Sequence, residues 1–334
     1  MMKSLKIPLV GLLDPHTKTL LPLIALFISL LLLTGTSIAQ SPAMTFITLG
    51  TASGPDAVPD RAQPANALVV GTNVYLVDAG DGAGAQLAKA GFRLPGVKGL
   101  FLSHLHFDHT GGVLAVLGLR MQLDTTDPLL ILGPPGTQDF IDGLVAGMLP
   151  AQQAAFGVPG RTWQHRLDVR ELRDGDQVNL DGVILSVAEN THYQSPQYDA
   201  SPGSVSLSFR FDGSDRSIVY TGDTGPSEAV TELARNADLL VSEMMDIPLA
   251  LANIRQINPG MPEAVMTGLE IHFRAHHLTP EQVATMATEA GVREVVVTHF
   301  GPGISSTAQA QAYTEMMATH YSGPVHFAND LDTF

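Results

Sequence analysis

A short segment rich in metal-binding side chains constrains this chain more than any other feature. Residues 103–109 read SHLHFDH and follow the apolar run 99–103 directly, so three imidazoles and a carboxylate lie within six residues. Zinc binds imidazole nitrogen and carboxylate oxygen at about 2.0–2.2 Å, so several ligands must converge on each ion. On extended or turning backbone, His104 and His106 project to the same side, while Asp108 and His109 continue toward a second position. The segment therefore predicts two metal ions that share one loop.

Further ligand types recur where other apolar runs end. His192 closes VILSVAENTH, Asp223 stands in YTGD, and His299 closes REVVVTH. Each alone is more often an ordinary solvated residue, but ligands tend to collect at the ends of strands in folds that mix helices and strands. We expect all three side chains at the same edge as residues 103–109.

The remaining chain alternates short β-type runs with helical runs. We expect strands at residues 45–49, 67–70, 73–78, 99–103, 129–132, 183–187, 205–211, 217–221, 238–242 and 294–298. We expect helices at residues 86–89, 138–149, 227–235, 279–291 and 308–320; Thr279, Pro280 and Gln282 form a strong helix start. The chain mixes hairpins with strand–helix units, and its two halves have a similar layout with no linker between them. This pattern predicts one α/β domain, an αββα sandwich of two mixed sheets flanked by helices.

The segment with His104, His106, Asp108 and His109 resembles the HxHxDH motif of the metallo-β-lactamase fold superfamily. The later order of His192, Asp223 and His299 fits the same pattern. The resemblance implies that His104, His106 and His192 bind one metal, that Asp108, His109 and His299 bind the other, and that Asp223 bridges the two. Two divalent ions, with Zn²⁺ expected, are the implied cofactors.

Within that superfamily the chain is most similar to the ribonuclease Z-like branch, which includes an arylsulfatase group and some phosphodiesterases. The similarity runs from about Thr45 to the C-terminus and includes LGT at 49–51, YLVDAG at 75–80, SE at 242–243, HLT at 277–279 and THF at 298–300. It implies that His277 assists the leaving group and that Glu243 orients it, so Asp108, His277 and Glu243 are the expected catalytic residues. His276 competes with His277 for this role, but only His277 stands in the His-x-Thr position.

The amino-acid composition limits the classes of partner and chemistry that are expected. The chain has no cysteine, which excludes disulfides, cysteine ligands and a thiol nucleophile. It carries 18 Lys and Arg against 33 Asp and Glu, a formal charge of −15. Binding to a nucleic-acid backbone relies on clustered Lys and Arg, and we find no long basic, Gly/Pro-rich arm of the kind that grips tRNA. The sequence therefore argues against nucleic acid as partner and favours a small-molecule ester; it leaves the oligomeric state open, a dimer included.

The N-terminus reads as a targeting segment. Residues 20–33 are the apolar run LLPLIALFISLLLL, which follows three lysines and is shorter than the ~20 residues that span a bilayer. Ser37, Ile38 and Ala39 then offer a small-x-small cleavage site. We expect a signal peptide at 1–39, a hydrolase domain at 40–334 and a periplasmic or secreted protein; an uncleaved membrane anchor is the alternative.

These observations predict an exported dinuclear-metal hydrolase that uses a metal-bridging hydroxide to cleave a small anionic ester, a sulfate or phosphate ester. The first alternative is a phosphodiesterase or endonuclease of the ribonuclease Z type. The second is a redox or non-catalytic metal protein of the same fold. The sequence does not decide the substrate or the metal used in the cell.

Other features receive weaker interpretations. Residues 80–84 read GDGAG but lack the GxGxxG spacing of a dinucleotide loop. Asp78 is expected either to support the metal loop or to be an ordinary strand-end residue. Segments 143–163 and 247–273 could cover the site or pack as surface helices. Four histidines without ligand-like context are read as surface or packing residues: His165, His272, His320 and His326.

Overall fold

Two mixed sheets of seven strands each organise the part of the chain that the computed structural model describes, residues 43–154, 164–194 and 203–334. In spatial order, the first sheet contains β14 (Asp332–Thr333), β1 (Met44–Gly50), β2 (Ala65–Val70), β3 (Asn73–Ala79), β4 (Val97–Phe101), β5 (Leu129–Gly133) and β6 (Leu167–Glu171). The second contains β13 (Val325–Phe327), β12 (Val295–Gly301), β11 (Leu239–Met245), β10 (Ser217–Tyr220), β9 (Leu207–Asp212), β8 (Val183–Glu189) and β7 (Gln177–Leu180).

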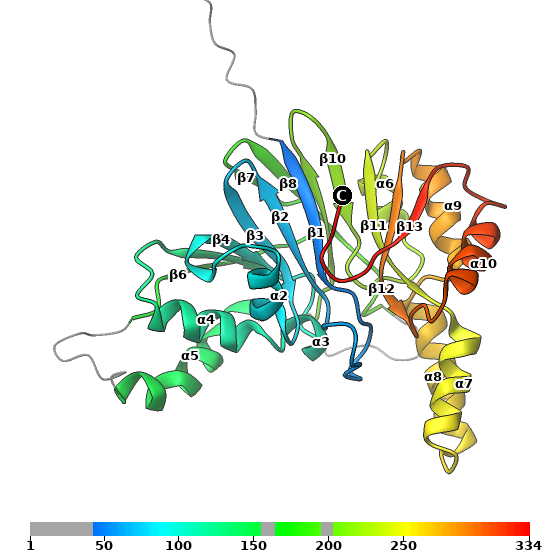
Figure 1. Ribbon diagram of the computed structural model, residues 1–334, viewed down its shortest axis with the longest axis horizontal. Helices are drawn as coiled ribbons and strands as arrows, with labels where there is room; N and C mark the ends of the chain where they lie inside the picture. The colour runs from blue at the N-terminus through cyan, green and yellow to red at the C-terminus, as the bar shows by residue number, and fades with distance from the viewer. Residues whose placement is uncertain (1–42, 155–163, 195–202) are drawn as a thin grey trace, which may run out of the picture. The chain divides into compact units, whose positions relative to one another are not determined.

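Helices flank both sheets, and Figure 1 shows α4 and α5 beside one sheet and α9 and α10 beside the other. The first half contains α2 (Ala83–Lys89), the 3₁₀ turn η1 (Leu94–Gly96), α3 (Phe107–Thr110), α4 (Val113–Gln122) and α5 (Thr137–Gln153). The second half contains α6 (Glu228–Leu233), α7 (Ile247–Ile257), α8 (Glu263–His276), α9 (Pro280–Ala290) and α10 (Thr307–Met317).

The two sheets repeat one pairing scheme. In each, neighbouring strands at one end pair antiparallel and those at the other end pair parallel; β3, β4, β5 and β6 are parallel neighbours in the first sheet, as are β10, β11, β12 and β13 in the second. Because the carboxyl ends of parallel neighbours lie at the same edge, residues that follow or end β4, β10 and β12 are brought to one side of each sheet.

Side-chain alternation places the apolar residues in three layers. In β4, Phe101 packs between the sheets, whereas its neighbours Leu100 and Leu102 pack on the outer face with α2, α4 and α5. In β11, Leu239 and Val241 point between the sheets, and Leu240 points outward against α6 and α9. Strands buried on both faces read as continuous apolar runs, and this burial creates the predicted αββα sandwich.

The start of α9 follows from its own sequence. The Thr279 hydroxyl accepts a hydrogen bond from the Gln282 amide, and the Gln282 side chain accepts one from the Thr279 amide. Pro280 occupies the first helical position, and Gly291 ends the helix in the left-handed conformation. This reciprocal cap satisfies amides that the first turn cannot, and it confirms the predicted helix bounds.

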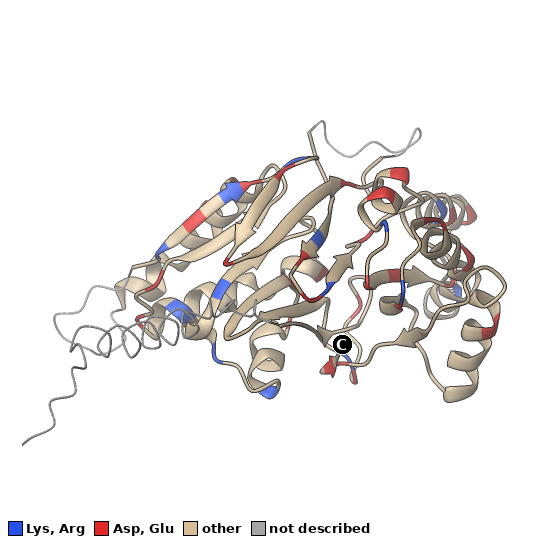
Figure 2. Ribbon diagram, turned by 90° about the horizontal axis from the view of Figure 1, so that it is seen from above, with Lys and Arg blue, Asp and Glu red and all other residues tan. Residues whose placement is uncertain are grey.

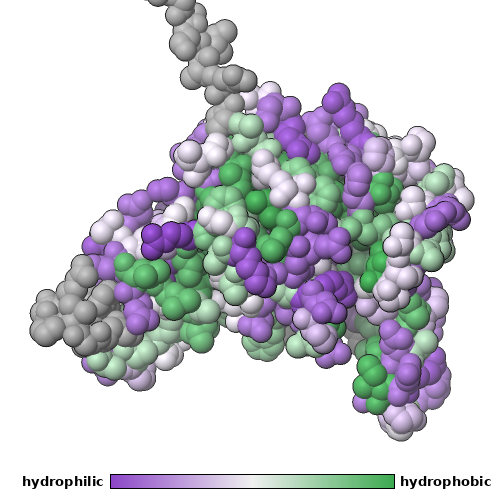
Figure 3. Space-filling model, in the orientation of Figure 1, coloured by the Kyte–Doolittle hydropathy of each residue, from purple (hydrophilic) through white to green (hydrophobic). Residues whose placement is uncertain are grey.

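Some large apolar side chains remain at the surface. Leu114 and Leu119 of α4 and Leu123 directly after it are exposed, and so are Ile257 and Val265 at the tip of the α7–α8 hairpin. Figure 3 shows hydrophobic surface on the side where α4 and α5 lie and on the projecting hairpin. Among the described residues, no helix has the length and apolarity needed to cross a membrane. The predicted signal peptide at 1–39 lies outside the described residues.

The fold class is as predicted, with limited differences in its elements. The hairpin expected at 205–221 is present as β9 and β10, and the helix expected at 86–89 begins three residues earlier, as α2. The sequence reading missed α4 and the edge strands β6, β7, β13 and β14. Segment 247–273, left open as a cover, forms the α7–α8 hairpin; of segment 143–163, residues 155–163 lie outside the described residues.

Candidate metal centre

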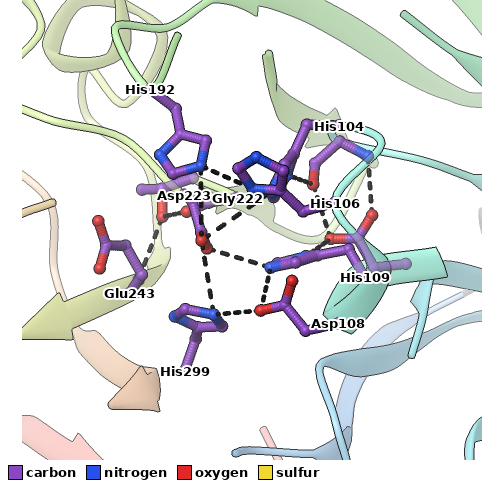
Figure 4. A network of polar contacts seen from close by, with 12 residues as sticks. His104, His106, Asp108, His109, His192, Gly222, Asp223, Glu243 and His299 are labelled. Carbon is purple, nitrogen blue, oxygen red and sulfur yellow. Dashed lines mark hydrogen bonds and ion pairs between the residues drawn. The ribbon is translucent and has the colours of Figure 1, made fainter. Parts of the chain in front are cut away.

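The structure brings all seven predicted metal ligands into two adjoining groups. His104 and His106 follow β4, and Asp108 and His109 lie on the short helix α3. The second sheet supplies the other three, since His192 follows β8, Asp223 follows β10, and His299 lies near the end of β12. Figure 4 shows these side chains pointing toward one another. Neither sheet alone carries a complete group.

The first group consists of three imidazoles. The Nδ1 atom of His106 lies 3.1 Å from Nε2 of His104 and 3.1 Å from Nε2 of His192. Zinc–nitrogen bonds of about 2.0–2.1 Å in tetrahedral geometry separate two ligand nitrogens by roughly 3.4 Å. The three nitrogens therefore have the spacing that one metal ion requires.

The second group combines two imidazoles with two carboxylates. The His299 Nε2 atom lies 3.4 Å from an Asp108 oxygen and 3.5 Å from Asp223 Oδ2, and His109 Nε2 lies 3.3 Å from Asp223 Oδ1. The four residues present ligand atoms within 4.8 Å of one another. This donor set also fits a divalent ion.

Asp223 lies between the groups. Its Oδ2 atom is 4.0 Å from His104 Nε2 and 3.9 Å from His192 Nε2, while its Oδ1 atom faces His109. The central place of Asp223 is visible in Figure 4. Since Oδ2 also lies 3.5 Å from His299 Nε2, the carboxylate contacts both groups, which is the geometry of a bridging ligand.

Two buried polar atoms test whether the cluster fits metal ions. His109 Nε2 and Asp223 Oδ1 are buried, and neither has a hydrogen-bond partner among the described residues. Such atoms normally find a partner in folded proteins. Both atoms face the second group, so a metal ion there would satisfy them, and the residues present fit the ions that the sequence predicts.

Hydrogen bonds on the far side of the rings fix which nitrogen faces the centre. Ring Nδ1 of His104 lies 3.0 Å from the Ser103 hydroxyl, and Nδ1 of His192 lies 3.0 Å from the backbone carbonyl of His276. A proton on each Nδ1 leaves the Nε2 lone pair free for a metal. Burial lowers the pKa of His104 and of His192, which favours the neutral imidazole that a metal needs.

Asp78 holds the metal loop from behind. Its carboxylate accepts hydrogen bonds from the Ser103 amide at 2.7 Å, the Ser103 hydroxyl at 2.7 Å, the Tyr220 hydroxyl at 2.8 Å and His109 Nδ1 at 2.8 Å. Asp78 is fully buried and adopts a positive φ of 59°. Of the two sequence interpretations, the supporting role agrees with these contacts, and such partners orient metal ligands.

Close backbone packing explains two glycines near this loop. A Cβ atom on Gly80 would collide with the backbone carbonyl of Asp108, and one on Gly112 would collide with the carbonyl of Gly80. Glycine therefore allows the end of β3 to lie directly against α3. Within the GDGAG run, Gly80 has this packing role, whereas Gly82 and Gly84 have no such close contact.

The carboxylates of the centre are held in the ionised state. Burial raises the pKa of Asp108, but the hydrogen bond with His299 and the charges of His109 and His299 outweigh it and lower the pKa to about 2. Burial likewise opposes ionisation of Asp223, and the surrounding imidazoles lower its pKa well below its usual value. Both groups therefore offer negative charge to cations.

His277 and Glu243 form a buried pair beside the centre. The Nδ1 atom of His277 lies 3.2 Å from one Glu243 oxygen, and the other Glu243 oxygen accepts the amides of Thr224 and Leu278. Burial lowers the pKa of His277, but the Glu243 carboxylate outweighs burial and the net pKa is raised. Because Nδ1 of His277 is hydrogen-bonded to Glu243, its other ring nitrogen is available to face Asp223 and His192.

Several contacts of the centre were not found in the sequence. The Tyr193 ring packs against His104, His106 and His192 with centroid distances of 5.1–5.8 Å. His272, read as a surface or packing residue, lies close to the centre, with its ring 5.8 Å from that of His277. The position of Tyr193 directly after a predicted ligand was the one available signal.

Comparison with known proteins identifies the family. Residues 56–300 match the family model described as the beta-lactamase superfamily domain. The chain belongs to the metallo-β-lactamase superfamily, as the HxHxDH motif predicted.

Among its members, the chain is 33% identical to "Ribonuclease Z" of Mycobacterium avium (strain 104) over 293 residues, which cover 85% of this chain and 95% of that protein. Solved structures with the same fold include human tRNase Z, short form (TM-score 0.60, 20% identity, 87% and 98% of the two chains). Another is the metallo-beta-lactamase fold protein YhfI from Bacillus subtilis (TM-score 0.61, 18% identity, 87% and 98%). These relatives agree with the ribonuclease Z-like branch and weigh against the expectation that nucleic acid is not a partner.

Proposed function

We propose that this metal-dependent hydrolase is a dinuclear phosphodiesterase of the ribonuclease Z type. The observation that carries the proposal is the 33% identity to a ribonuclease Z along 95% of that protein. The buried His277–Glu243 pair beside the ligand cluster agrees with it, since cleavage of a phosphodiester releases an alkoxide that needs a proton. This function replaces hydrolysis of a small sulfate or phosphate ester as the first choice.

We assign two metal ions, with zinc expected, to the two groups of ligands. His104, His106 and His192 would hold one ion; Asp108, His109 and His299 would hold the other, with Asp223 shared. Two divalent ions carry four positive charges, and the two carboxylates remove only two. Such a pair of ions lowers the pKa of bound water and stabilises the entering and leaving oxygens of a displacement. The net positive charge of the centre favours an anionic ester over a neutral amide.

His277 then acts on the leaving group. Glu243 accepts a hydrogen bond from Nδ1–H of His277 and fixes the ring, so a proton on the other nitrogen points toward the centre. The raised pKa of His277, caused by Glu243, keeps that proton available near neutral pH. Glu243 is itself held by two backbone amides, which restrict its rotation.

A small ester remains the second candidate because of charge. The chain carries −15, and Figure 2 shows Lys and Arg scattered singly among Asp and Glu over the described residues. Affinity for an RNA backbone depends on grouped cations. A compact phosphodiester or a sulfate ester needs no such surface.

One experiment separates these functions. The purified protein is reconstituted with Zn²⁺ and given methyl p-nitrophenyl phosphate, p-nitrophenyl sulfate and a precursor tRNA with a 3′ trailer. The proposal expects turnover of the phosphodiester, and cleavage of the tRNA would extend it to an endonuclease. Turnover of the sulfate without either phosphodiester would overturn it. The Asp223→Asn variant, set against Asp212→Asn on the β9–β10 hairpin, shows that the activity belongs to this centre.

We also propose that residues 1–39 are an export signal and that residues 40–334 are the mature hydrolase domain. The apolar run at 20–33 and the small residues Ser37 and Ala39 support this proposal. Removal would delete three lysines and one aspartate, leaving 15 basic and 32 acidic residues and a charge of −17. Mass spectrometry of protein from a periplasmic extract should give an N-terminus at Gln40; an intact Met1 in a membrane fraction would indicate an anchor.

A further inference from the structure

A small pocket adjoins the three-histidine group at His106. It has a volume of about 220 Å³ and is lined by Leu105, His106, Pro135, Tyr193, Ser204 and Val205. The lining residues come from both halves of the chain, so the pocket, like the metal centre, forms only where the two sheets meet. None of the roles assigned so far uses it.

The pocket is connected to the centre through two rings. His106 turns its Nδ1 atom toward His104 and His192, and the same side chain lines the pocket. The Tyr193 ring lies 5.1 Å from the His106 ring at a steep angle of 74°, so it stands as a wall beside His106. A molecule held at the three-histidine group therefore lies next to the pocket, with His106 as their shared side chain.

The chemistry of the described lining favours an uncharged group. Leu105, Pro135 and Val205 are apolar, Tyr193 presents a ring, and the Ser204 hydroxyl is neutral. Among the described residues, no Lys, Arg, Asp or Glu lines the pocket, so a second phosphate or a carboxylate would lose its water there without gaining a charged partner from them.

The size of the pocket limits that group to a ring. A protein cavity of about 150 Å³ is large enough to bind benzene, whereas pockets for larger ligands occupy about 300–1,000 Å³. An aromatic wall favours a flat partner that stacks on it or meets its edge.

We propose that this pocket binds one uncharged aromatic ring of the ester substrate, a phenyl ring or a nucleobase, while the phosphoryl group lies at the metal centre. The placement of the phosphoryl group at the metal centre rests on the proposed function. The binding of an aromatic ring in the pocket does not. It makes Tyr193 and Leu105 the residues that set substrate preference.

The test compares two ligands that differ only in the ring. Titration calorimetry on the Zn²⁺-loaded protein measures the affinities of phenylphosphonate and methylphosphonate. The wild type should bind the phenyl compound at least tenfold more tightly. Ser204 is exposed at the pocket, so Ser204→Leu and Ser204→Trp should fill it without disturbing the core. The ratio of affinities should decrease with Ser204→Leu and approach one with Ser204→Trp.

Ser214→Trp is the matched control, because Ser214 is an exposed serine in the β9–β10 turn, at the opposite end of β10 from Asp223. It should keep the wild-type ratio, and circular dichroism should show all variants folded. A wild-type ratio near one, or an unchanged ratio in Ser204→Trp, would overturn the ring pocket even if methyl p-nitrophenyl phosphate is hydrolysed. A large ratio without any phosphodiester turnover would instead retain the pocket and reject the proposed function.

Discussion

Replacing Asp78 by asparagine should weaken metal binding while leaving the fold intact. The carboxylate accepts two bonds from Ser103, one from Tyr220 and one from His109 Nδ1, all at 2.7–2.8 Å. In the Asp78→Asn variant the side-chain carbonyl can still accept the Ser103 amide, but the side-chain nitrogen then faces the other donors. The two hydroxyls can rotate and accept a hydrogen bond. A protonated Nδ1 on His109 cannot.

The expected loss of stability follows from the one contact that cannot be restored, the hydrogen bond from His109 Nδ1. Losing a hydrogen bond to a charged group costs about 1.5–3 kcal/mol, so the free energy of unfolding should decrease by roughly this amount and not by the loss of all four contacts. To accept a hydrogen bond from the introduced amide, His109 must move its proton to Nε2, the atom that faces Asp223. In that tautomer Nε2 carries the proton, so it has no lone pair with which to bind a metal. Removing such an orienting partner typically lowers metal affinity by about 10–100-fold.

Chelator competition with elemental analysis measures this effect. One ion should leave Asp78→Asn at a lower chelator concentration than in the wild type. Asp181→Asn is a close control, since Asp181 also has a positive φ and also accepts a tyrosine hydroxyl, that of Tyr75 at 3.0 Å, far from the centre. Unchanged affinity for both ions in Asp78→Asn would refute the argument that this carboxylate sets the His109 tautomer.

Three further outcomes are expected. Full reconstitution should give two metal ions per chain, because the seven ligands form two groups; elemental analysis that gives one or fewer would contradict this. Asp223→Ala should lower turnover more than loss of any single histidine ligand, since it removes a ligand and a negative charge from both groups; near-normal turnover with two ions bound would exclude bridging. His277→Ala should retain both ions and lower kcat by about 10²–10⁴ for poor leaving groups, with a smaller loss for nitrophenolate and a milder effect in Glu243→Gln. The acid form of His277 exists below its raised pKa, so wild-type kcat should decrease as pH rises through that pKa. His277→Ala should lack this decrease. If kcat depends on the pKa of the leaving group in the same way in both proteins, His277 only positions the substrate.

The grouping of the seven candidate ligands could be predicted because its signals are local. His104, His106, Asp108 and His109 stand together in the chain, and His192, Asp223 and His299 each close an apolar run. The cap of α9 was equally visible, since Thr279 and Gln282 contact each other within one turn. Where the contacts lie within a few residues, residue type and spacing suffice.

The missed features depend on distant contacts or weak patterns. Tyr220 reaches Asp78 across 142 residues of sequence, and the His276 carbonyl supports His192 across 84. The strand β14 has only two residues, which are too few to show a pattern, and the alternation in β6 rests on Leu167 and Val169 alone. Tertiary packing determines these elements, and their local sequence signals are absent or weak.

The division of ligands between the two sheets has a consequence for how the protein acquires its metals. The candidate ligand that comes last in the chain, His299, belongs to β12, so it leaves the ribosome after the other six. A nascent chain therefore carries only part of the donor set, and the complete set exists only after His299 is synthesised and the sheets dock. Because affinity for divalent ions follows a fixed order among metals, the metals available where folding finishes determine which ions are captured. If the chain crosses a membrane unfolded, the metal ions present in the destination compartment determine which ions it binds, and those in the cytoplasm do not.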